Sequence, residues 1–104
     1  MHLVQILLPL YDNDGRPIDR ALFARVAAEL TERFGGLTAY TRAPAEGIWK
    51  EESESGATAR DQIVIYEVMT EALDAAWWGG YRRGLEERFR QEVVVVRAQE
   101  TRLL

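Results

Sequence analysis

The feature that most constrains the fold is a pair of apolar stripes at helical spacing, each lying between strand-like segments. The first stripe follows three- and four-residue steps: Ile18, Leu22, Phe23, Val26, Leu30 and Phe34. The second stripe repeats every four residues: Leu73, Trp77, Tyr81, Leu85 and Phe89. Such spacing gathers apolar side chains on one side of a helix. We therefore expect two amphipathic helices, each packing one side against a sheet.

The residues around these stripes mark where the helices begin and end. Pro17 and Asp19 suit a helix start, since proline presets φ and aspartate caps free N–H groups. The pair at 35–36 is Gly-Gly, which suits the left-handed cap that ends a helix. Thr70 is predicted to cap the second helix, with Glu71 and Asp74 complementing its positive end.

The rest of the chain is predicted to form mainly strands. Four segments are rich in β-branched and aliphatic residues and are predicted to be extended: 2–11, 37–42 with a continuation in 48–50, 61–69 and 91–99. The polar stretch 51–59 is predicted to be the loop of a hairpin between the second and third strands. The element order is therefore strand, helix, strand, strand, helix, strand.

This order predicts an α+β fold of the ferredoxin-like βαββαβ type, formed by residues 1–104 as a single domain. Right-handed crossovers place both helices on one face of a four-stranded antiparallel sheet. The strands would then lie in the order fourth, first, third, second. The first and third strands are the most apolar, as the two central strands should be.

The strands are apolar on both faces, although two helices can cover only one. In the first strand Val4 and Ile6 point one way, and Leu3 and Leu7 point the other. A large bare apolar face is rare in a soluble monomer. The sequence therefore predicts a homodimer in which the helix-free face is at least partly covered.

Composition excludes several classes of function. The 104 residues contain no cysteine, so thiolate metal sites and cysteine nucleophiles are absent. A net charge of −4 argues against nucleic acid as a partner, including RNA on the sheet face. The apolar N-terminus lacks the features of a signal peptide or membrane span, which favours a cytoplasmic protein without a membrane partner. His2 is the only histidine and has no ligand spacing around it, so we expect a flexible terminal residue, no metal and no cofactor.

Seven residues are candidates for contact with a small molecule: Gln5, Tyr40, Arg42, Trp49, Arg60, Tyr66 and Glu67. Aromatic rings can form the walls of a pocket, and an arginine can hold an anion. Glu67 stands in an apolar strand, where burial could adapt it to proton transfer. The alternative is structural: an ion pair at the sheet edge with half-buried tyrosines.

The second helix carries two unusual patterns. Trp77 belongs to the apolar stripe and is expected in the core, whereas Trp78 should lie at the edge of the stripe. Ala76, Gly80 and Gly84 form a row of small residues. This row predicts a close approach of the helix to the sheet or to the first helix.

Several short motifs resemble those of a family of small uncharacterised bacterial domains. The motifs are FGGLT at 34–38, GIW at 47–49, Tyr81, and RFRQE at 88–92 before a valine-rich strand. The resemblance implies a ferredoxin-like fold similar to that of dimeric α+β barrel proteins. It supplies no catalytic residues.

Two functions remain open from the sequence. The first is a non-catalytic domain that binds a small molecule or serves in assembly, because no nucleophile or metal motif is present. The second is a cofactor-free enzyme of the dimeric α+β barrel type, similar to small monooxygenases or isomerases. Glu67 would then be its base, Arg42 or Arg60 would stabilise an anion, and Tyr66 would assist.

Overall fold

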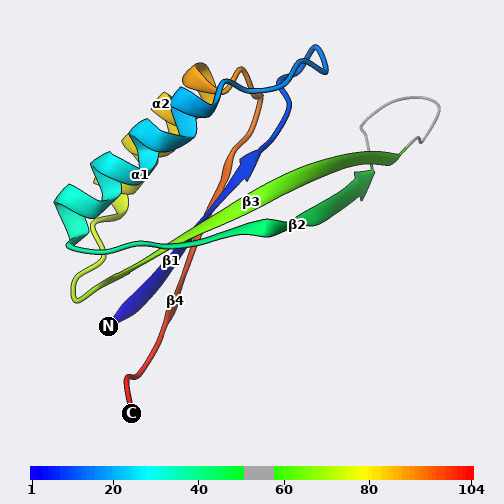
Figure 1. Ribbon diagram of the computed structural model, residues 1–104. Helices are drawn as coiled ribbons and strands as arrows, with labels where there is room; N and C mark the ends of the chain where they lie inside the picture. The colour runs from blue at the N-terminus through cyan, green and yellow to red at the C-terminus, as the bar shows by residue number, and fades with distance from the viewer. Residues whose placement is uncertain (51–57) are drawn as a thin grey trace.

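The computed structural model describes the backbone of residues 1–50 and 58–104, and the side chains of these ranges except 42–45, 49–50 and 58–61. Six elements follow one another along the chain (Figure 1): β1 (His2–Pro9), α1 (Arg20–Phe34), β2 (Thr38–Lys50), β3 (Thr58–Thr70), α2 (Ala75–Arg88) and β4 (Val95–Glu100). The α+β class predicted from the sequence is confirmed. No helix in the described ranges is long and apolar enough to cross a membrane.

The strands form one antiparallel sheet in the order β2-β3-β1-β4. β1 is central and pairs with β3 on one side and with β4 on the other. Gln5 of β1 thereby stands opposite both Glu67 of β3 and Arg97 of β4. Because paired residues project to the same side of a sheet, this register decides which side chains meet.

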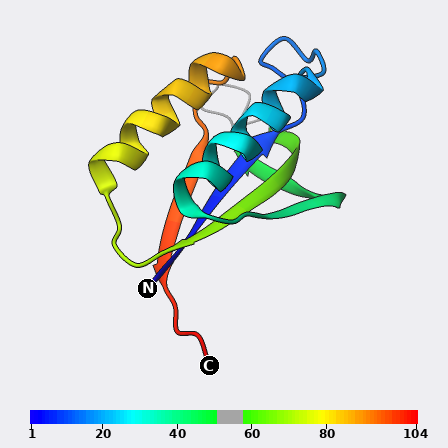
Figure 2. The same ribbon diagram turned by 60° about the vertical axis from the view of Figure 1, so that its left-hand side comes forward.

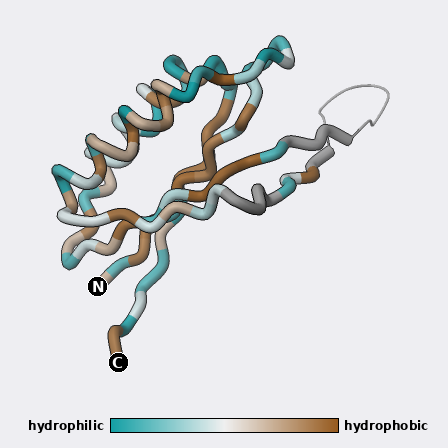
Figure 3. Tube along the Cα trace, viewed as in Figure 1, coloured by the Kyte–Doolittle hydropathy of each residue, from teal (hydrophilic) through white to brown (hydrophobic). Residues whose placement is uncertain are grey.

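Both helices lie on the same side of the sheet, as the turned view in Figure 2 shows. The core between the layers consists of twelve buried residues: Val4, Ile6, Leu8, Val26, Leu30, Val64, Tyr66, Val68, Trp78, Leu85, Phe89 and Val94. β1 and β3 supply every second residue to it, as strand geometry requires. Hydrophobic residues run along these central strands in Figure 3.

The first helix begins and ends where the sequence indicates. Asp19 is its N-cap and accepts a hydrogen bond from the backbone N–H of Ala21. Gly35 closes it with φ of 80°, a conformation that glycine adopts without steric cost. The prediction for the second helix is wrong: Thr70 ends β3, and Asp74 is the N-cap, accepting from the N–H of Trp77.

The two tryptophans exchange the roles expected of them. Trp78 is buried at 5% exposure, whereas Trp77 is only half-buried. Residues four apart drift by about 40° around a helix at each step, whereas residues seven apart nearly coincide. Leu85 anchors α2 in the core, so Trp78, seven residues earlier, shares its side. Trp77, eight residues earlier, has turned away.

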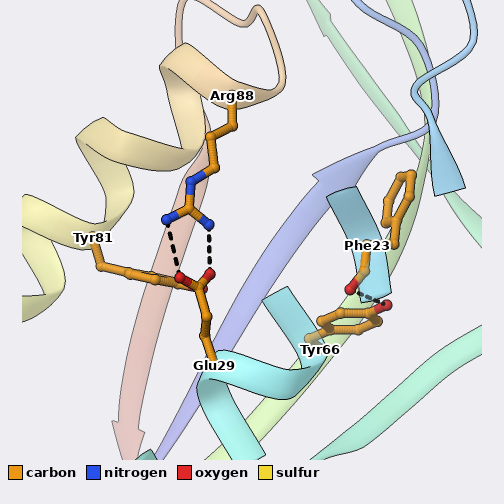
Figure 4. Close-up of polar contacts among 5 residues, drawn as sticks. All are labelled: Phe23, Glu29, Tyr66, Tyr81 and Arg88. Atoms are coloured by element: carbon orange, nitrogen blue, oxygen red, sulfur yellow. Dashed lines mark hydrogen bonds and ion pairs between the residues drawn. The ribbon is translucent and has the colours of Figure 1, made fainter. Parts of the chain in front are cut away.

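The small-residue row of α2 does not produce a close approach, so that prediction is wrong. A Cβ atom added at Gly84 would meet nothing within 4 Å, and one at Gly80 would meet only the Arg83 side chain. Side chains connect the helices instead. Arg88 of α2 binds both carboxylate oxygens of Glu29 on α1, and the Tyr81 hydroxyl donates to the same carboxylate at 3.1 Å (Figure 4).

Candidate functional site

A row of polar side chains crosses the helix-free face of the sheet. Arg97 Nε donates to Gln5 Oε1 at 2.8 Å, and Gln5 Nε2 donates to Glu67 Oε1 at 2.5 Å. The Tyr40 hydroxyl donates to the other Glu67 oxygen, Oε2, at 3.2 Å. These four residues, here called the polar row, come from β4, β1, β3 and β2 in turn. Their hydrogen bonds therefore join all four strands.

The charges of the polar row are placed asymmetrically. The Arg97 guanidinium lies at the β4 end, and the Glu67 carboxylate lies toward β2. The negative charge of Glu67 raises the pKa of the Tyr40 hydroxyl, and the hydrogen bond between them acts in the same direction. Tyr40 is therefore a protonated hydrogen-bond donor at neutral pH.

Apolar residues flank the polar row on both sides. Together with the row they form the surface here called the open face, whose apolar members are Leu3, Leu7, Pro9, Ile63, Ile65, Met69 and Val95. No helix or strand of the described ranges lies over this face (Figure 1). The open face thus combines an apolar surface with a few ordered polar groups, a composition typical of binding sites.

A groove of about 370 Å³ adjoins the polar row at the point where α1 leads into β2. Its lining comes from the helix end, the start of β2 and the neighbouring parts of β1 and β3: Leu3, Phe34, Gly35, Gly36, Leu37, Thr38, Glu67, Val68 and Met69. Glu67 is the one charged residue of this lining. It therefore belongs both to the groove and to the polar row.

The structure brings together three of the residues singled out from the sequence. Gln5, Tyr40 and Glu67 are hydrogen-bonded neighbours on the open face. Arg42, Trp49 and Arg60 lie on the β2–β3 hairpin, and their side chains fall outside the described residues.

Tyr66 lies apart from this group. It projects from β3 toward the helices and is 5% exposed, because it directly precedes Glu67 and neighbours on a strand point to opposite faces. Its hydroxyl donates to the backbone oxygen of Phe23 at 3.5 Å (Figure 4), and burial raises its pKa. Tyr66 lines a second, larger groove of about 630 Å³ near the start of α1.

The sequence analysis missed Arg97. The available signal resembled the one that singled out Gln5, namely a polar residue in an otherwise apolar strand. Alternation along β4 places Arg97 on the same face as Val95. The sequence does not reveal the register between β1 and β4, and it is this register that places Arg97 beside Gln5.

Metal binding gains no support from the described residues, among which no three histidine or acidic side chains cluster suitably. His2 is part of β1, where it pairs with Thr70 and Glu100, and not a flexible terminal residue as expected. Its Nδ1 atom is buried and has no hydrogen-bond partner in the structure.

Comparison with known proteins identifies a likeness of fold. No protein-family profile and no curated protein matches the chain, so the resemblance to small bacterial domains stays a prediction. Among solved structures, a phage SAM lyase in complex with S-methyl-5′-thioadenosine is similar at 21% identity and a TM-score of 0.58, over 95% of this chain and 80% of that one. A phage SAM lyase in the apo state is similar at 18% identity and a TM-score of 0.54, over 94% and 78% of the two chains. At these identities the likeness establishes the fold that the chains share.

Proposed function

We propose that this domain binds a small nucleoside-type molecule in the groove beside Glu67. The observation that carries the proposal is the position of Glu67, a half-buried carboxylate that joins an ordered polar row to an apolar-walled groove. The βαββαβ element order and the strand order β2-β3-β1-β4 also support assignment of the domain to the ferredoxin-like folds.

The chemistry of the groove suits hydroxyl-bearing or cationic ligands. Each Glu67 oxygen accepts one hydrogen bond from Gln5 or Tyr40, which leaves further lone pairs for a ligand. Phe34 and Met69 offer apolar walls, and the backbone at Gly35 lies open to close approach. The volume of about 370 Å³ is at the lower end for small-molecule sites.

The fold likeness selects the nucleoside class among such ligands. The similar phage enzyme is described with S-methyl-5′-thioadenosine bound. A ribose diol presents two hydroxyl donors to a carboxylate, and a sulfonium group would pair with its negative charge. Both features match the single acidic side chain of the groove.

Calorimetric titration with S-methyl-5′-thioadenosine and with S-adenosylmethionine tests the proposal. We expect saturable binding of at least one of them, and Glu67→Gln should weaken it by about tenfold or more because a charged hydrogen-bond acceptor is lost. Glu32→Gln is the matched control, since it changes an exposed carboxylate on α1 that does not line the groove. No binding up to millimolar ligand, or equal binding by Glu67→Gln, would refute the proposal.

The second candidate is a cofactor-free enzyme that cleaves S-adenosylmethionine or a related sulfonium compound. The likeness to a SAM lyase over nearly the whole chain favours it, as does a carboxylate held in position by two donors. Chromatographic detection of S-methyl-5′-thioadenosine released from S-adenosylmethionine separates the two functions. Binding with no release beyond the uncatalysed rate indicates the non-catalytic domain, whereas release that Glu67→Gln abolishes indicates the enzyme.

A further inference from the structure

We infer that a second copy of this chain covers the open face, related to the first by a two-fold axis parallel to the strands, with Arg97 of each copy bound to Glu67 of the other. This inference is argued without the groove ligand, although the Glu67 carboxylate takes part in both proposals. It concerns the protein alone and assigns a symmetry and a specific ion pair to its self-association.

The apolar part of the open face requires a partner. Met69 is 48% exposed and Val95 is 45% exposed, and between them Leu3, Leu7 and Ile65 are only half-buried. The helices lie on the opposite side of the sheet and cannot reach these residues. Contiguous apolar surface of this kind marks a site of association.

The area is sufficient for a dimer. Four strands about 4.8 Å apart and an eight-residue β1 at about 3.4 Å per residue give a face of roughly 500 Å² in projection. Two such faces together bury on the order of 1,000 Å², the lower bound for a stable interface. The open face alone can therefore support a dimer, although not an especially tight one.

The unused bonding capacity of the polar row identifies the partner. Arg97 is exposed and uses only its Nε–H group, in the bond to Gln5, which leaves the donors of both terminal nitrogens free. Among the described residues no carboxylate lies within ion-pair distance of Arg97. The matching acceptor, Glu67, stands at the other end of the same row with lone pairs to spare.

Symmetry decides how two such rows meet. A two-fold axis that runs parallel to the strands, between β1 and β3, packs the open faces of two copies against each other with their polar rows running in opposite directions. β4 of one copy then lies over β2 of the second copy, and β1 lies over β3. Arg97 therefore faces Tyr40 of the second copy and lies one strand spacing, about 4.8 Å, to the side of its Glu67, within reach of the long arginine side chain. The same contacts recur on the other side of the axis. An axis across the strands would instead set Glu67 on Glu67 and Arg97 on Arg97. Charge complementarity therefore selects the parallel axis.

Charge reversal tests the arrangement. Size-exclusion chromatography with light scattering should show a dimer of the wild-type chain at micromolar concentration. Glu67→Arg and Arg97→Glu should each raise the dissociation constant by about tenfold or more, because each leaves like charges facing one another. The double variant Glu67→Arg/Arg97→Glu should regain the dimer, since the ion pair is restored with its direction reversed.

Mixing the two single variants provides a test that does not depend on comparing separate preparations. Glu67→Arg carries arginine at both positions 67 and 97, and Arg97→Glu carries glutamate at both. An equimolar mixture should therefore form a one-to-one heterodimer more tightly than either variant associates with itself. Circular dichroism confirms that both are folded before mixing. Glu87→Arg, an exposed position on α2, is the charge-matched control and should dimerise as the wild type does.

Three outcomes would overturn the inference. They are a monomeric wild type at micromolar concentration, single variants that associate as strongly as the wild type, and a double variant that stays monomeric although folded. The Arg97→Glu results also keep the inference separate from the ligand proposal, because Arg97 does not line the groove.

Discussion

The two faces of the sheet are built from the same strands yet differ in almost every physical respect. On the face beneath the helices, Ile6 and Leu8 of β1 are completely buried. On the open face, Leu7 lies between them in sequence and is only half-buried. Residues of nearly equal hydrophobicity thus have different environments, because only one face has a second layer.

The two faces also differ in the polar groups that they contain. Among the described residues the helix-covered core contains no buried charge, and its polar side-chain groups are the hydroxyl of Tyr66 and the indole N–H of Trp78. The open face holds a carboxylate, a guanidinium and an amide in one hydrogen-bonded row. Burying such groups in a core without water costs free energy. On a surface that contacts water or a partner, the same groups can provide binding specificity. The helix-covered face therefore stabilises the fold, whereas the polar and apolar groups of the open face are exposed to a ligand or partner.

The largest expected difference between the faces appears on truncating adjacent leucines. Leu8→Ala should lower the free energy of unfolding by about 3 kcal/mol, because it leaves a cavity in the core. Leu7→Ala should cost about 1 kcal/mol in dilute solution, since its side chain is half-buried. Urea denaturation of both variants measures the difference. Equal costs in dilute solution would show that the open face is as well packed as the core.

A smaller effect is expected where the covering helices are joined. Hydrogen bonding to Arg88 lowers the pKa of Glu29 from its ordinary value of 4.5, although partial burial opposes the shift. Glu29→Gln should therefore lower stability at neutral pH, by less than about 1 kcal/mol because the pair is partly exposed to solvent.

The pH dependence of this effect has a definite sign. A lowered carboxyl pKa stabilises the fold above the unfolded-state pKa, and this contribution is lost as the pH falls through the folded-state value. The stability difference between wild type and Glu29→Gln should thus be greatest at neutral pH and vanish well below pH 4.5. Urea titrations at several pH values measure it, and a difference that grows on acidification would contradict the assignment.

Removing the Tyr66 hydroxyl from the core should have a still smaller effect on stability. Tyr66→Phe removes a hydroxyl whose hydrogen bond to Phe23 is long, at 3.5 Å. We expect a change in unfolding free energy of less than about 0.5 kcal/mol. Ligand binding at the Glu67 groove should be unaffected, because Tyr66 does not line that groove. Loss of binding in this variant would place the ligand in the larger groove, which Tyr66 lines.

The last prediction concerns Tyr40 on the open face and should not measurably change stability. The Glu67 carboxylate raises the pKa of Tyr40, so Glu67→Gln should lower the pH at which this phenol ionises. Ultraviolet titration of wild type and variant reports the change against the other three tyrosines. The same comparison in a Tyr40→Phe background should show no difference; a persistent difference would assign the shift to another tyrosine.

Periodicity in the sequence accounts for much of the fold but not for the details of α2. The stripe from Ile18 to Phe34 predicts α1, and Asp19 and Gly35 end it as expected. The four-residue repeat through Trp77 and Leu85 is misleading, because a true helix turns every 3.6 residues and brings Trp78 into line instead. The N-cap of α2 is Asp74 and not the predicted Thr70, because β3 continues through Thr70, which pairs with His2.

The candidate site was predictable only in part, because some of its residues give a local signal in the sequence and others do not. Gln5 and Glu67 are polar residues in apolar strands, a local signal that any chain displays in its sequence. Tyr66 was included as an aromatic wall of a pocket, although alternation along β3 directs it to the face opposite Glu67. Arg97 joins the site through pairing between strands 92 residues apart, which no local pattern encodes.

The sequence by itself determined the class of fold, the approximate positions of the extended segments and of the two helices, and the fact that the strands are apolar on both faces. These properties follow from side-chain periodicity, which is local. The last strand begins at Val95, four residues later than the predicted start at residue 91. The tertiary structure decided which face the helices cover, which tryptophan enters the core and which polar residues meet. Those outcomes depend on strand register and layer packing, where one residue of slip moves every side chain to the opposite face.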